Sequence, residues 1–280
     1  MRRYWLILPL AFLLFGVGPV YAQGEPEWRS WPLGQRFGVD LGAFFANLET
    51  TVRLDGTNGI LGTSISFEQD LGLDDSKIRP MVAAHWRFFK KHRLDVSYFN
   101  LDRSGDSSTT VNIRFGDFNF QANLPLQAFL DIEVFNLGYS YSVLFDEKKE
   151  LAFGLALSFQ DLAVGMQGTV QGQPLEVSEG ESFLAPLPTF TGRFNYAFTP
   201  KWILNVSLGF FTIETDLGET QLDGTIVAAM TSIKWQLFKH FNVGLGYNVF
   251  DVDVETENER RITDIDYQYN GPTLFMGASF

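Results

Sequence analysis

The C-terminal stretch Thr273-Leu274-Phe275-Met276-Gly277-Ala278-Ser279-Phe280 decides how the rest of the chain is interpreted. Its even-numbered positions carry Leu274, Met276, Ala278 and Phe280, whereas small residues occupy most of the positions between them. Residues two apart share one face of a β-strand, so this alternation predicts a strand with one apolar face. The chain is therefore expected to end in a strand whose apolar face needs an apolar neighbour.

The same two-residue period recurs along the chain and predicts ten antiparallel strands. Each is long enough for the roughly 9–11 tilted residues with which a β-strand crosses a bilayer. The connections alternate between short turns and longer loops, and an even strand number places both chain ends on one side of a membrane. The pattern predicts an all-β, transmembrane, antiparallel up-and-down β-barrel over residues 36–280. The expected strands are residues 36–51, 78–90, 93–104, 127–145, 150–167, 187–198, 201–215, 223–238, 240–255 and 267–280.

Basic residues indicate which strand face points into the barrel. An Arg or Lys that faces lipid at the middle of a bilayer costs about 2–4 kcal/mol, so such residues are expected inside and the aromatic and aliphatic faces outside. Because a barrel of this size is narrow, we expect charged side chains of mixed sign to pair and to block or narrow the lumen. A narrow selective pore is the alternative. The predicted lumen network consists of Asp40, His85, Arg87, Arg93, Asp95, Arg193 and Lys234.

Residues 1–22 have the pattern of a cleavable export signal. A mostly apolar stretch ends in Val20-Tyr21-Ala22, which suits cleavage after Ala22. A single membrane anchor is the alternative, but prolines and glycines interrupt the apolar stretch. We therefore expect Sec-type export, followed by a short periplasmic segment over residues 23–35.

The composition excludes several classes of protein. The chain has 280 residues with 21 basic and 33 acidic side chains, and its net charge of −12 argues against a nucleic-acid partner. It has no cysteine, so neither a disulfide framework nor lipid attachment through an N-terminal cysteine is possible. Aromatic residues make up 15% of the chain, which suits the lipid-facing girdles of a membrane barrel.

No group of residues in the sequence predicts catalysis. His85 is expected in the lumen near Asp95 and Ser97, but no local motif accompanies this combination of Ser, His and acid. His92 and His240 lie in short basic turns and are expected on the periplasmic surface. We therefore predict no catalytic residue, no cofactor and no metal ion.

Two acidic groups leave a weaker cation-binding alternative open. The run from Asp70 to Asp75 lacks the spacing and the closing Glu of an EF-hand loop. The alternating acids between Asp251 and Glu259 are expected to form a solvated external extension of a strand. Binding of divalent cations that bridge lipopolysaccharide phosphates is the alternative for this second group.

Together these features resemble the small outer-membrane β-barrel proteins of Gram-negative bacteria. The resemblance is carried by Val20-Tyr21-Ala22, by the strand alternation and by the terminal Phe280. The segments 71–88 and 92–98 are also similar to a set of uncharacterised barrels of this size. The resemblance implies an outer-membrane location and contact with outer-membrane lipids and lipopolysaccharide. It also implies that the barrel-assembly machinery recognises Phe280 on the last strand.

Barrels of this kind include pores, adhesins, enzymes and membrane-stabilising proteins, so the fold leaves the activity open. We expect a non-enzymatic barrel that has a structural role or provides a narrow passage for small solutes. One alternative is an outer-membrane lipid-modifying enzyme. The other is a surface interaction or adhesion protein that uses loops 52–77, 105–126 and 168–186.

Overall fold

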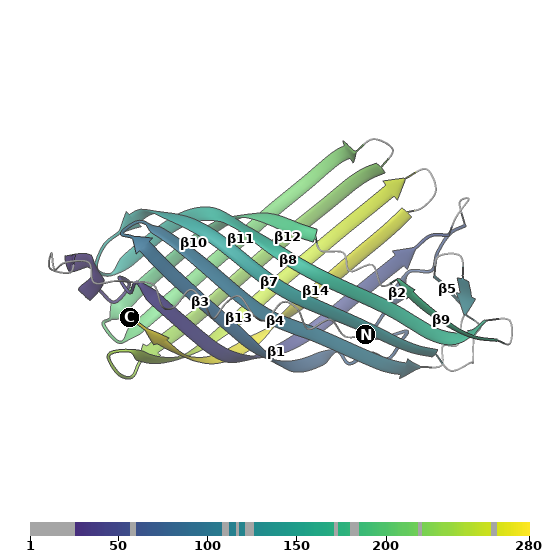
Figure 1. Cartoon of the computed structure of the whole chain (residues 1–280), viewed down its shortest axis with the longest axis horizontal. Helices are drawn as coiled ribbons and strands as arrows, with labels where there is room; N and C mark the ends of the chain where they lie inside the picture. The colour runs from purple at the N-terminus through teal and green to yellow at the C-terminus, as the bar shows by residue number, and fades with distance from the viewer. Residues whose placement is uncertain are drawn as a thin grey trace, which may run out of the picture.

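A single antiparallel sheet curls into a closed ten-stranded barrel in the computed structural model (Figure 1). Each barrel strand overlaps in residue range with one of the ten predicted strands, which confirms the predicted all-β barrel. Most strands extend further than predicted. The barrel strands are β1 (Phe37–Leu54), β3 (Ser76–Phe89), β4 (His92–Ser107), β7 (Leu126–Phe145), β8 (Lys149–Val170), β10 (Ala185–Thr199), β11 (Trp202–Leu217), β12 (Thr220–Gln236), β13 (Phe241–Asn258) and β14 (Ile262–Ser279).

The structure describes residues 26–56, 60–107, 112–115, 118–120, 126–170, 173–179, 185–217, 220–258 and 262–280. The expected export signal over residues 1–22 and its cleavage after Ala22 lie outside these residues. Within the described ranges, no helix is both long and apolar enough to cross a membrane.

Pairing between the first and the last strand closes the barrel. β14 aligns with β1 from Gly38↔Ser279 onward, and β1 aligns with β3 along its other edge. Phe280 extends the seam, because Arg36 and Phe37 donate their N–H groups to its carbonyl at 2.6 and 2.9 Å. An unpaired backbone group in hydrocarbon costs several kcal/mol, so a sheet in lipid needs this closure.

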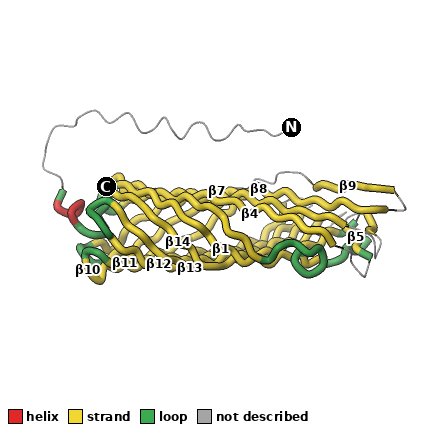
Figure 2. The backbone as a smooth tube through the Cα atoms, turned by 90° about the horizontal axis from the view of Figure 1, so that it is seen from below, coloured by secondary structure: helices red, strands yellow, loops and turns green. Residues whose placement is uncertain are grey.

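The two ends of the barrel differ. Phe280 and the first described residues lie at one end, together with the tight turns, and we call this the short-turn end (Figure 2). The opposite, long-loop end carries short additional strands beside the barrel (Figure 1). These are β2 (Ile65–Ser66), which pairs with β1, β9 (Gln173–Glu179), which pairs with β8, and the hairpin of β5 (Ile113–Phe115) and β6 (Phe118–Phe120).

The outer surface changes from apolar to acidic along the strands. Near the short-turn end large apolar side chains point outward, and Leu208 and Leu245 are both 61% exposed. Further along β13 the outward positions carry Asp251 and Asp253. β8 has 22 residues, about twice the length that crossing a bilayer requires. The apolar band therefore marks the membrane-spanning part, and the remainder of the wall projects beyond it.

The interior changes in the opposite direction, which the sequence analysis did not anticipate. Inward side chains are polar toward the short-turn end, as expected, but they form an apolar core toward the long-loop end. The outer wall meets water there, so apolar surface is buried inside the barrel instead of against lipid. The wall contributes Phe44, Leu48, Val52, Phe99, Leu101, Leu130, Ile132, Val134, Ile226, Phe250, Val252, Tyr267 and Tyr269 to this core.

Residues 60–75, which lie in a predicted external loop, complete the apolar core, and we call them the plug segment. Its Glu68 carboxylate accepts a hydrogen bond from the Thr50 N–H at 3.0 Å and forms an ion pair with Arg103. Arg103 also donates to the Thr50 hydroxyl at 2.5 Å, so a buried polar anchor joins the segment to β1 and β4. The hairpin residue Ile113 packs into the same core. The plug side chains in the core are Ile65, Phe67, Leu71 and Leu73.

The first described residues cover the short-turn end. The 3₁₀-helix η2 (Glu27–Ser30) precedes Trp31, whose ring lies 5.5 Å from that of Phe145. Leu33 is buried in a small cluster that also contains Phe145 and Ile203. The chain segment that precedes β1 is therefore packed against the barrel.

The outer apolar band gives a testable prediction. Replacing Leu245 by Arg is expected to destabilise the folded protein in lipid vesicles by about 2–4 kcal/mol, because the charge would face hydrocarbon. The matched change Thr51→Arg, on the projecting part of β1, is expected to stay within about 0.5 kcal/mol of the wild type. Urea unfolding in vesicles measures both values, and equal effects of the two changes would contradict the assignment.

The projecting wall is expected to gain stability as the pH falls. Burial and the neighbouring Asp102 raise the pKa of Asp131 above its usual value. Burial together with Asp251 and Asp253 does the same for the pKa of Asp266. A raised folded-state pKa contributes stability that is fully present below the unfolded-state pKa and is lost as the pH rises through the folded-state pKa.

Asp131→Asn should therefore be more stable than the wild type at pH 7 and should show a flatter pH dependence of the unfolding free energy. Asp146 provides a control of opposite sign. Burial alone would raise the pKa of Asp146, but hydrogen bonds from the N–H groups of Lys148 and Lys149 lower it below its usual value. Asp146→Asn is expected to lose stability at pH 7, and a loss in both variants would refute the prediction for Asp131.

Candidate functional site

The polar part of the lumen contains a cavity of about 280 Å³, which we call the lumen cavity. Every barrel strand except β13 contributes to its lining in the described part of the chain. The structure brings six of the seven predicted lumen residues together around it, whereas Arg87 is not among the lining residues. The six are Asp40, His85, Arg93, Asp95, Arg193 and Lys234.

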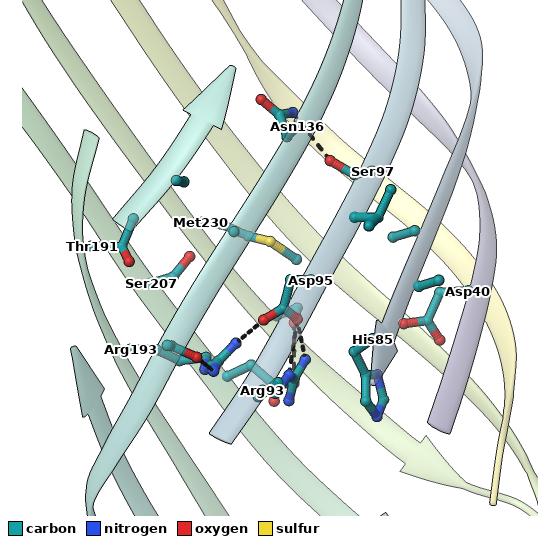
Figure 3. A pocket seen from close by; sticks show the side chains of 18 of the residues that line it. Asp40, His85, Arg93, Asp95, Ser97, Asn136, Thr191, Arg193, Ser207 and Met230 are labelled. Carbon is teal, nitrogen blue, oxygen red and sulfur yellow. Dashed lines mark hydrogen bonds and ion pairs between the residues drawn. The ribbon is translucent and has the colours of Figure 1, made fainter. Parts of the chain in front are cut away.

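Asp95 on β4 is the central acceptor in the lumen cavity. Arg93 from the same strand donates to Asp95 Oδ1 at 2.6 and 2.9 Å. Arg193 on β10 donates to Asp95 Oδ2 at 2.6 Å and also binds the hydroxyl of Ser140 on β7 (Figure 3). One carboxylate therefore joins two guanidinium groups and ties distant strands of the wall together.

A second ion pair crosses the lumen elsewhere. Lys234 Nζ on β12 lies 2.6 Å from Asp40 Oδ2 on β1, and the ammonium group also lies 5.3 Å from the ring of Phe275. Gly277 on β14 makes room for this pair, because a Cβ atom there would lie 2.0 Å from Asp40 Oδ1. The glycine on the inward face is therefore required by the neighbouring carboxylate.

Arg87 forms a separate buried ion pair nearer the short-turn end. Its Nη2 lies 2.7 and 2.9 Å from the two oxygens of Glu150, and the side chains are 1% and 0% exposed. Asn195 donates to the same carboxylate at 2.8 Å, and the Arg87 guanidinium lies 4.4 Å from the ring of Phe145. Sequence analysis missed Glu150, although it lies two residues before Ala152 and shares its inward face.

His85 lines the lumen cavity without joining Ser97 or Asp95. Its ring lies against Gly38, where an added Cβ would come within 2.3 Å of Cε1. Ser97 accepts a hydrogen bond from Asn136 at 3.1 Å, and Asp95 is bound by the two arginines. Within the described residues, no hydrogen bond links the Ser, His and acid that the sequence placed near one another.

The other two histidines lie at the short-turn end. His92 Nδ1 contacts the Tyr139 hydroxyl at 2.7 Å, and His240 Nδ1 contacts the Ser279 carbonyl at 2.9 Å. The ring of His240 stacks on Phe280 with 4.9 Å between ring centres. Phe280 is 63% exposed beside the closing seam, where its side chain is accessible from outside.

The acidic groups that left cation binding open do not converge. Asp74 forms an ion pair with Lys77 in the plug region. Asp251 and Asp253 point outward on β13, and Glu259 lies outside the described residues. Among the residues that the structure describes, no group of three or more His, Cys, Asp or Glu side chains could hold a metal ion.

The buried Arg87–Glu150 pair generates a prediction about stability. Arg87→Met leaves the Glu150 carboxylate buried without its ionic partner, which is expected to cost about 3–5 kcal/mol in urea unfolding. The double variant Arg87→Met/Glu150→Met removes both charges and should be more stable than the single variant.

The exposed pair of Asp146 and Lys149, with 3.9 Å between its charged atoms, serves as the control. Lys149→Met is expected to change stability by less than about 1 kcal/mol. A double variant less stable than Arg87→Met would show that the buried charges do not act as a pair.

Comparison with known proteins supports the architecture. No protein-family model and no curated protein matches the sequence. The crystal structure of the outer membrane protease OmpT from Escherichia coli matches with a TM-score of 0.53 at 9% identity, covering 88% of this chain and 97% of that chain.

Two further solved structures have lower TM-scores. The Pseudomonas putida toluene transporter TodX has a TM-score of 0.34 and 10% identity, covering 93% of this chain and 94% of its own. The outer membrane protein OprG from Pseudomonas aeruginosa has a TM-score of 0.34 and 10% identity, covering 88% of this chain and 97% of its own. The chain has the fold of the outer-membrane β-barrel proteins of Gram-negative bacteria.

Proposed function

We propose that the protein is a closed, non-conducting outer-membrane barrel with a structural role. In this proposal the short-turn end faces the periplasm and the long-loop end projects outside the cell. The observation that carries the proposal is the apolar core inside the long-loop half of the barrel. A solute that entered the polar part of the lumen would have to cross this core.

Aromatic rings form the layer of the core next to the polar lumen. Phe44 on β1, Phe99 on β4 and Tyr269 on β14 contact one another with ring centres 5.4 to 5.9 Å apart. Phe250 on β13 stacks on Tyr269 at 4.8 Å. Moving an ion into such surroundings carries a large desolvation cost, so the layer favours a seal over a narrow passage.

The hydrogen bonds of the candidate catalytic residues favour a non-enzymatic role. Within the described residues, His85 forms no hydrogen bond with Ser97 or Asp95. His92 and His240 lie at the short-turn end. A lipid-modifying enzyme of the outer membrane would need its acid and base near the outer rim. The long-loop half offers no histidine among its described residues.

The proposed membrane contacts follow from the outer surface. The outward apolar band would contact outer-membrane lipids, and the wall just beyond it would lie at the level of lipopolysaccharide head groups. The exposed Phe280 at the closing seam suits recognition of the last strand by the barrel-assembly machinery before β14 pairs with β1.

The rate at which ions leak from vesicles that contain the reconstituted protein tests whether the lumen is sealed. Wild-type protein is expected to give no stable conductance in planar bilayers and no leak above that of protein-free vesicles. The inward pair of changes Phe44→Ser/Phe99→Ser should raise the leak of small ions, because it removes two rings from the aromatic layer.

The outward pair Phe45→Ser/Tyr98→Ser is the matched control, because it changes rings on the same strands that are 39% and 43% exposed on the outer surface. It should leave the leak unchanged, with insertion verified by protease protection. A large, stable conductance of the wild-type protein would overturn the proposed function.

A further inference from the structure

The charged groups in the polar lumen do not balance. On the inward faces between the short-turn end and the apolar core, the described residues include four cations but only three carboxylates. His85, if neutral, adds no charge, so one positive charge remains in excess. The cations are Arg87, Arg93, Arg193 and Lys234, and the carboxylates are Asp40, Asp95 and Glu150.

The geometry locates the excess at Asp95. In the direct ion pairs, Arg87 binds Glu150 and Lys234 binds Asp40, whereas Arg93 and Arg193 share the single carboxylate of Asp95. Arg193 is the less satisfied of the two, because its buried Nε atom has no hydrogen-bond partner among the described residues. The Arg193 side chain is only 14% exposed, and incomplete compensation of its charge is unfavourable in a barrel surrounded by hydrocarbon.

The surroundings of Arg193 suit a small anion. Ser207 lies directly opposite Arg193 in the pairing of β10 with β11, and Thr191 lies one inward position further along β10 (Figure 3). Both hydroxyl groups belong to residues that line the lumen cavity and can donate hydrogen bonds. The lumen cavity has a volume of about 280 Å³, which is several times the roughly 30 Å³ that one water occupies. An ion and its waters therefore fit.

We propose that the lumen cavity binds one small monovalent anion, such as a halide, nitrate or a short carboxylate, at Arg193. One further negative charge, added to those of the three carboxylates, balances the four cations, whereas a divalent anion would reverse the imbalance. The ion would be held as a structural counter-ion beside Asp95, and this inference does not depend on whether the barrel conducts.

Refolding in bromide tests the site. The purified chain is refolded in detergent in sodium bromide, and a crystal structure is measured at the bromine absorption edge. An anomalous bromide peak is expected in the lumen cavity within hydrogen-bonding distance of Arg193. The thermal midpoint of the wild type should also rise with bromide when gluconate keeps the ionic strength constant.

Charge variants separate a specific site from a general salt effect. Arg193→Gln should lose both the peak and the bromide-dependent rise, and Arg93→Gln replaces it if the first variant does not refold. Lys239→Gln removes the same charge from an exposed turn and should retain both. Asp95→Asn raises the excess charge and should lower the bromide concentration that gives half of the rise. Absence of the peak, or equal bromide responses of wild type and Arg193→Gln, would overturn the proposal.

Discussion

The closed ladder of backbone hydrogen bonds is the constraint on which the structure depends. Lipid offers no partner to a free N–H or C=O group, so the sheet can cross the membrane only if β14 returns to β1. Closure divides every strand into an inner and an outer face. Each residue then meets one of four surroundings: lipid, external water, the polar lumen or the apolar core.

These four surroundings explain why one alternating pattern serves two opposite purposes. Leu41 and Phe45 on β1 face outward in the apolar band, whereas Phe44 and Leu48 on the other face lie inside. Asp40 and Phe44 share the inward face of the strand and lie in the polar and apolar parts of the interior. The same strand therefore supports a membrane barrel near one end and an ordinary water-facing barrel near the other.

The sequence predicts the strands well because a two-residue period is a local property that can be counted. It also predicts that Arg93, Arg193 and Lys234 turn inward, because only one face of each strand tolerates their charge in lipid. Partners are not local properties, and Glu150 was missed because its significance depends on Arg87, 63 positions away. The sequence predicts an external loop for the plug segment, because the alternation at Ile65 and Phe67 is too short for a strand that crosses a bilayer. Only the shape of the barrel mouth shows that these side chains have a core to enter.

The covered short-turn end has a consequence for the order of assembly. The residues around Trp31 and Leu33 pack against Phe145 and Ile203, which belong to strands in the middle of the chain. This docking place exists only after β7 and β11 have been brought into one wall. The first part of the described chain can therefore dock only after later parts have folded. Its packing at the short-turn end is a late step of maturation.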